Sequence, residues 1–96
     1  MVMKTIDLFQ AIEIIAENEW TILVIDASGL IREAIPFDSD PPIQWGYNNQ
    51  SRIKGCGVKY VPRGKLTMAE LESTIHEVVD AILLFKDYEQ DSKDEG

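Results

Sequence analysis

Apolar residues recur at helical spacing soon after the start of the chain. One face of the predicted helix is formed by residues at positions i, i+3, i+4 and i+7, namely Leu8, Ala11, Ile12 and Ile15. Two further apolar residues, Phe9 and Ile14, are expected to widen this buried face. Asp7 followed three residues later by Gln10 is typical of a capping pair. The pattern predicts a helix over residues 7–18.

A second amphipathic helix is predicted near the end of the chain. Thr67 and Glu70 have the spacing of a capping box, and Leu66 lies where a hydrophobic staple begins. Its apolar stripe is formed by Leu71, Ile75, Val78, Val79, Ile82 and Phe85. We expect this helix to end near Tyr88. Since residues 89–96 contain no apolar side chain, the sequence predicts one domain over 1–88 followed by a disordered acidic tail over 89–96.

The stretch between the two helices is rich in β-prone residues. Residues 20–26 and 30–37 are such runs, and the short connection over 27–29 has the composition of a tight turn. We therefore predict an antiparallel hairpin. The first of its strands is apolar on both faces, which is typical of an interior strand.

A long connection and a third strand region follow the hairpin. Residues 38–51 have loop composition with two consecutive prolines, and a loop of this length is often a binding loop. Strand character resumes over 52–61, where Gly55 and Gly57 mark either a bulge or a tight turn.

This order of elements predicts an α+β fold. We expect a small two-layer sandwich in which an antiparallel sheet of three to four strands carries the N-terminal helix and the long C-terminal helix on one face. The last helix is longer than so small a sheet requires. This excess length favours a homodimer formed through the C-terminal helix.

Charge is distributed unevenly along the chain. Seventeen acidic and nine basic residues give a formal net charge of -8. Residues 1–40 carry eight acids and two bases, residues 67–96 carry nine acids and two bases, and residues 41–66 carry five bases without an acid. The middle block is therefore the part of the chain that is expected to face an anion.

The middle block supplies a candidate ligand site. Its predicted members are five cations and two aromatic residues, Arg52, Lys54, Lys59, Arg63, Lys65, Trp45 and Tyr47. Cations next to a helix start favour a phosphate, and aromatic rings beside them stack on bases, so this set indicates a phosphorylated small molecule or a nucleotide. The competing interpretation is that the cations pair with neighbouring acids and that Trp45 caps one end of the sheet. The spacing does not match a P-loop.

No catalytic or metal site is predicted. His76 lies at four-residue spacing from Glu72 and Asp80, which indicates an ion pair on a solvated helix face better than a metal site. Cys56 between two glycines has no evident general base close to it in the sequence. We expect a protein that is not an enzyme and that needs no cofactor.

The acidic ends of the chain favour a different function. A small acidic protein suits the binding of a basic macromolecule, such as inhibition of the phage, toxin–antidote or immunity type, because charge complementarity raises association rates. A single cysteine and the lack of a secretory or membrane-spanning segment favour the cytoplasm. We predict a non-enzymatic protein-binding function, with the phosphorylated ligand bound over 44–65 as the alternative.

Overall fold

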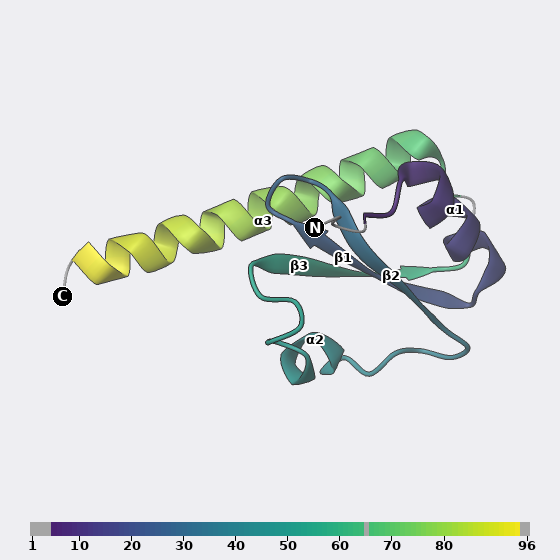
Figure 1. Ribbon diagram of the computed structural model, residues 1–96, viewed down its shortest axis with the longest axis horizontal. Coiled ribbons are helices and arrows are strands. Elements are labelled where there is room, and N and C mark those ends of the chain that lie inside the picture. The colour runs from purple at the N-terminus through teal and green to yellow at the C-terminus, as the bar shows by residue number, and fades with distance from the viewer. Residues whose placement is uncertain (1–4, 65, 95–96) are drawn as a thin grey trace.

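The computed structural model describes the backbone of residues 5–64 and 66–94, and the side chains of this part up to Leu84. Its elements follow one another as α1 (Leu8–Glu17), β1 (Trp20–Asp26), β2 (Ile31–Phe37), α2 (Trp45–Asn48), β3 (Cys56–Pro62) and α3 (Met68–Asp94) (Figure 1). The three strands form one sheet in the order β2-β1-β3, and both pairings are antiparallel. The predicted α+β fold is confirmed.

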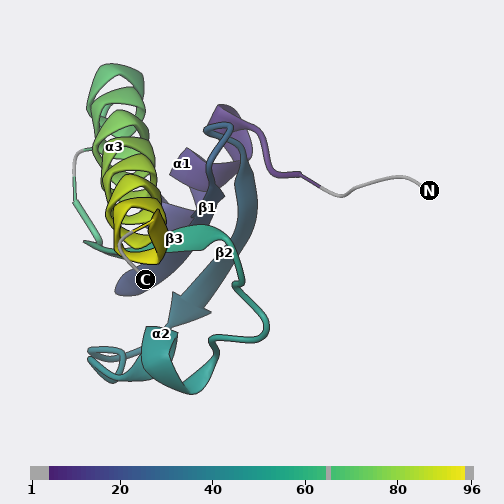
Figure 2. The same cartoon turned by 90° about the vertical axis from the view of Figure 1, so that its left-hand side faces the viewer.

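The two long helices lie on one face of the sheet, as predicted (Figure 2). Their common core combines buried residues of both helices and all three strands, namely Ala11, Ile15, Leu23, Ile25, Ile31, Val61, Leu71, Ile75 and Val78. Each capping pair is present. The Gln10 N–H donates to Asp7 Oδ1 at 2.8 Å, and the Glu70 N–H donates to Thr67 Oγ1 at 3.1 Å. These contacts fix where α1 and α3 begin.

The opposite face of the sheet is covered by the connection between β2 and β3. Trp45, at the start of α2, is 8% exposed and packs with the buried residues Ile22 and Val24 of β1. The Tyr60 hydroxyl donates to the carbonyl oxygens of Pro42 and Ile43, at 3.2 and 3.1 Å. The predicted loop over 38–51 is therefore packed on the sheet, and its coverage explains why β1 is buried on both faces.

Two sequence predictions need correction here. Residues 52–54 form turns rather than a strand, because Gly55 takes a φ of +78° and closes a turn directly before β3. Phe9 does not join the buried face of α1, since its side chain is 72% exposed. The helix start fixed by Asp7 places Phe9 beside the apolar stripe rather than within it.

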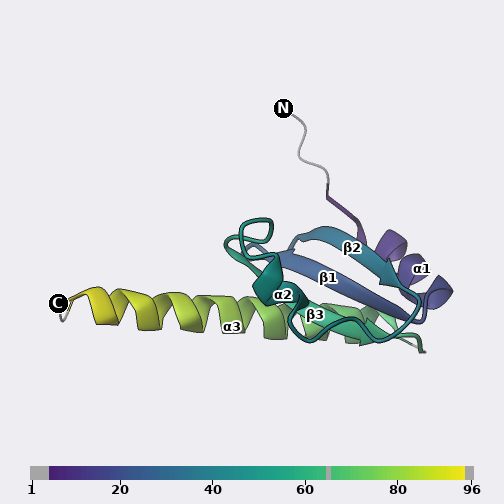
Figure 3. The same ribbon diagram turned by 90° about the horizontal axis from the view of Figure 1, so that it is seen from below.

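α3 is longer than predicted and extends past the sheet (Figure 3). It continues beyond the expected end near Tyr88 to Asp94, and the sequence between these residues contains no proline or glycine that would stop a helix. The division into a domain over 1–88 and a tail over 89–96 stays a prediction. Within the described part of the chain, no helix is long and apolar enough to cross a bilayer.

Candidate functional site

Arg52, a predicted ligand-binding cation, is engaged in an ion pair within the fold. Its Nε donates to Glu33 Oε2 at 3.2 Å, and its Nη2 donates to the other carboxylate oxygen of Glu33. The hydrogen bonds and the charge of Glu33 raise the pKa of Arg52 above its usual value. The guanidinium also lies 5.8 Å from the centre of the Trp45 ring. Arg52 thus ties the connection after α2 to strand β2.

Arg63, another predicted ligand-binding cation, donates hydrogen bonds to the C-terminal end of α1. Its Nε donates to the Asn18 carbonyl oxygen at 3.3 Å, and its Nη2 donates to the Glu17 carbonyl oxygen at 3.2 Å. The last carbonyl groups of a helix lack partners within the helix and carry a partial negative charge, so a cation there is favourable. Arg63 therefore caps α1 instead of facing an anion at the start of α3.

The remaining predicted ligand residues are dispersed. Successive side chains of β3 point to opposite faces of the sheet, and Tyr60 points to the face that Trp45 covers. Lys59 therefore points to the other face, which α3 covers. Lys54 and Tyr47 are exposed, whereas Trp45 is buried, and Lys65 lies outside the described residues.

The structure does not bring the described cations together. The seven residues of β3 span about 24 Å, at roughly 3.4 Å each. Lys54 precedes this strand and Arg63 follows it, so the two lie near opposite ends of the sheet. The predicted binding of a phosphate by residues 44–65 stays a prediction.

The environment of Cys56 disfavours its thiolate form. Burial raises the pKa of the Cys56 thiol, and the negative charge of Asp26 raises it further. A thiol of raised pKa is a poor nucleophile. Among the described side chains, no group of three or more His, Cys, Asp or Glu residues gathers closely enough to hold a metal ion.

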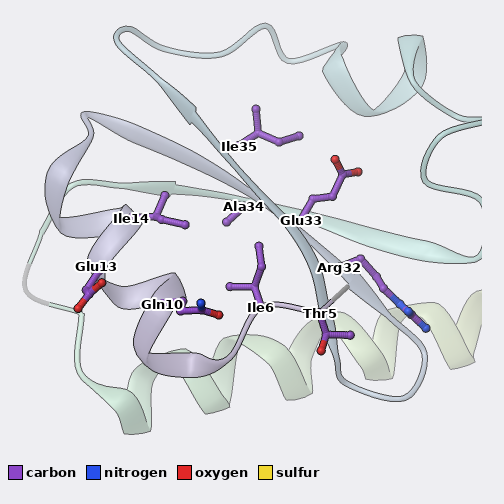
Figure 4. Close-up of a pocket in the computed structure, with 9 residues that line it drawn as sticks. All are labelled: Thr5, Ile6, Gln10, Glu13, Ile14, Arg32, Glu33, Ala34 and Ile35. Atoms are coloured by element: carbon purple, nitrogen blue, oxygen red, sulfur yellow. The ribbon is translucent and has the colours of Figure 1, made fainter. Parts of the chain in front are cut away.

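A first hollow of about 540 Å³ lies between α1 and the edge strand β2 (Figure 4). Figure 4 shows the apolar Ile6 and Ala34 near its centre, while the charged ends of Arg32 and Glu33 point outward. Arg32 Nε donates to Asp26 Oδ2 at 2.6 Å, and Glu33 pairs with Arg52. Arg32 and Glu33 thus already take part in ion pairs within the fold.

A second hollow, the helical groove, is more apolar. It measures about 620 Å³ and lies between the start of α1, the β1–β2 turn and the first half of α3. Its apolar lining consists of Ile6, Leu8, Phe9, Leu30, Ile31, Ile75 and Val79. Phe9 and Leu30 are 72% and 47% exposed, so they form an accessible rim above a buried floor. This groove was not predicted, because the apolar character of Phe9 indicated a place in the buried face of α1.

The helical layer is also the acidic layer of the molecule. Its exposed carboxylates include Asp7, Glu13 and Glu17 at α1 and Glu70, Glu72, Glu77 and Asp80 on α3. The walls of the helical groove come from residues 6–9, 28–31 and 72–79. All three segments belong to the two acidic blocks of the sequence, and none belongs to the basic block over 41–66.

The groove thus combines an apolar floor, an exposed aromatic and aliphatic rim, and acidic surroundings. Such a surface is suited to apolar contact and to attraction of positive charge. Comparisons with protein-family models, with curated proteins and with solved structures give no match to this chain.

Proposed function

We propose that this chain is a non-enzymatic binding protein that holds a basic protein partner on its acidic helical layer, as inhibitors of the antitoxin or immunity type do. The observation that supports this most is the helical groove, whose walls come entirely from the two acidic blocks. A partner that buries Phe9 and Leu30 removes apolar surface from water. Lysine and arginine side chains of the partner, next to this apolar contact, pair with the acids of α1 and α3.

The distribution of the cations supports the same function. The charge of Arg52 is paired with Glu33 of β2, whereas Arg63 binds backbone carbonyl oxygens and keeps its positive charge at the end of α1. Among the described residues that line the helical groove there is no lysine or arginine, so the field of Asp7 and Glu72 is not opposed within this lining. Attraction of this kind speeds association with a basic surface and weakens as salt rises, because the screening length is about 8 Å at physiological ionic strength.

The proposed function is tested by comparing which proteins the wild type and two matched double variants capture from a cell lysate. Glu72→Gln with Glu77→Gln removes two acids of α3, and Asp38→Asn with Asp40→Asn removes two acids of the connection on the other side. We expect the wild type and the Asp38/Asp40 variant to retain the same basic protein in low salt. The α3 variant should retain about tenfold less of this protein, because the removed acids no longer attract its positive charge. Equal retention by the two variants would contradict the proposal.

Two further properties belong to this proposal. We place the protein in the cytoplasm, and we expect copies to pair through α3, where Leu83 and Leu84 are 46% and 73% exposed. The molar mass in solution, measured by light scattering at several concentrations, tests the pairing.

The alternative function is the binding of a phosphorylated small molecule or nucleotide through residues 44–65. Its support is the cation–π contact between Arg52 and Trp45 and the exposed Tyr47, two residues after Trp45 in α2. Melting temperatures measured with a panel of nucleotides test it, because a ligand that binds the folded state raises the melting temperature. A rise that disappears in Arg52→Ala would favour this alternative over the protein partner.

A further inference from the structure

We infer that the helical groove is the docking site for a short basic amphipathic segment of the partner, which inserts apolar side chains between Phe9 and Leu30. This inference rests on the proposed function and adds the site and the chemical class of the bound segment. The groove volume of about 620 Å³ falls in the range of sites that enclose several side chains or a drug-sized ligand. A helix that lays its apolar face into such a groove is a common mode of peptide recognition.

The floor of the groove is already formed in the free protein. Ile31 is 2% exposed and Ile75 is 8% exposed, and both belong to the core beneath the two helices. Because these residues are held by the core, little ordering is needed when a partner binds. A preformed apolar floor therefore favours binding at this place.

Gly29 keeps the groove open at the β1–β2 turn. A Cβ atom at this position would lie 3.6 Å from Ile75 Cγ2 and 3.8 Å from Val79 Cγ2. Since glycine has no side chain, these two methyl groups remain uncovered on that side. The φ of +86° at Gly29 also belongs to the region that glycine adopts most readily. The turn thus shapes the groove as well as joining the two strands.

The charges of the rim specify a basic segment. Asp7 and Glu72 line the groove together with His76, and the described lining residues include no lysine or arginine. Asp7 Oδ1 accepts the Gln10 N–H, and the carboxylate retains acceptor capacity for a cation of the partner. An acidic segment would instead meet like charge at Asp7 and Glu72. Attraction and repulsion therefore select for lysine or arginine beside the apolar anchors.

The exposed apolar residues on the other side of the molecule give a matched control. Ile43 and Tyr47 are 90% and 75% exposed, so this pair is at least as exposed as Leu30 and Phe9, which are 47% and 72% exposed. They belong to the connection between β2 and β3 and do not line the helical groove. The double variants Phe9→Ser/Leu30→Ser and Ile43→Ser/Tyr47→Ser thus remove comparable apolar surface from two different places.

The probe is a helical peptide of leucine and lysine in amphipathic order, about 14 residues or four turns long. Two peptides of the same pattern serve as comparisons, one with glutamate in place of lysine and one with serine in place of leucine. Affinities are measured by calorimetry for the full chain and both double variants, and circular dichroism verifies that each variant is folded. We expect the leucine–lysine peptide to bind about tenfold more tightly than either comparison peptide.

The variants then locate the site. Phe9→Ser/Leu30→Ser should weaken the leucine–lysine peptide about tenfold or more, while Ile43→Ser/Tyr47→Ser should change its affinity less than about twofold. If the two double variants weaken the affinity for the leucine–lysine peptide equally, the groove is not the docking site. The proposed function still stands in that case if the glutamate peptide binds weakly. If the glutamate peptide binds as tightly as the lysine peptide, the acidic surface selects no basic partner and both proposals fail.

Discussion

Replacing Gly57 with alanine is expected to lower the free energy of unfolding by about 1–3 kcal/mol, the usual cost of forcing an extra methyl group into a packed core. A Cβ atom at Gly57 would lie 2.5 Å from Val78 Cγ1 and 3.3 Å from two atoms of the Ile82 side chain. Valine in a helix has one strongly preferred rotamer, so Val78 cannot turn aside cheaply. Urea denaturation measures the change.

Two controls separate this clash from a general effect of removing glycine. At Gly46 the added Cβ would make ordinary contacts, 3.8 Å from Val58 Cγ2 and 3.9 Å from Ile53 Cδ1, so Gly46→Ala should change stability little. Gly57→Ala should also cost less when Val78 is already alanine, because the clashing methyl group is then gone. If the cost is the same in both backgrounds, α3 does not approach β3 as closely as the structure shows.

Replacing Asp26 with alanine is expected to cost about 3 kcal/mol, since it removes several hydrogen bonds to one nearly buried carboxylate. Asp26 Oδ1 accepts the N–H groups of Ser28 and Leu30 at 2.9 and 3.0 Å, and Oδ2 accepts from Arg32 Nε at 2.6 Å. The side chain thus holds the β1–β2 turn, which forms one wall of the helical groove. Asp38→Ala, which removes an exposed acid, should change stability by less than about 0.5 kcal/mol.

The contribution of Asp26 should depend on pH in a defined direction. Burial by itself raises the pKa of Asp26, but the Leu30 N–H, the Arg32 guanidinium and the Ser28 N–H together lower it below its ordinary value of 3.8. A pKa lower in the folded state than in the unfolded state means that the stabilisation is complete above about pH 4 and is lost as pH falls through the folded pKa. The difference in unfolding free energy between wild type and Asp26→Ala should therefore shrink below about pH 4. A difference that stays constant down to pH 2 would contradict this role.

The local structure of this chain follows closely from its sequence. The capping pairs at Asp7 and Thr67 predict where both long helices begin, and a strand that is apolar on both faces predicts the central position of β1. These features depend on neighbouring residues, whose spacing is visible in the sequence. The packing of Trp45 against the second face of the sheet depends on contacts between distant segments, which spacing alone does not reveal.

The candidate site was harder to predict for the same reason. Lys54 and Arg63 are close in the sequence but lie near opposite ends of the sheet, because β3 spans the sheet between them, and Lys59 lies on the other face of β3 from Tyr60. Arg63 donates to the carbonyl groups of Glu17 and Asn18, which lie more than forty positions earlier in the chain. The spacing of residues in the sequence does not reveal a contact of this range. The division of charge into blocks was visible in the sequence. The fold then shows that segments of the two acidic blocks lie together around an apolar groove, which the sequence did not predict.

Photo-crosslinking in cells tests the central claim most directly. A photoreactive phenylalanine analogue replaces Phe9 on the rim of the helical groove in one variant and Tyr47 beside α2 in the other, two positions of 72% and 75% exposure. We predict that irradiation joins the Phe9 variant to a basic protein, that the Tyr47 variant gives much less of this product, and that Glu72→Gln/Glu77→Gln reduces it. A product that forms from the Tyr47 position and is missing from the Phe9 position would contradict the proposed docking surface.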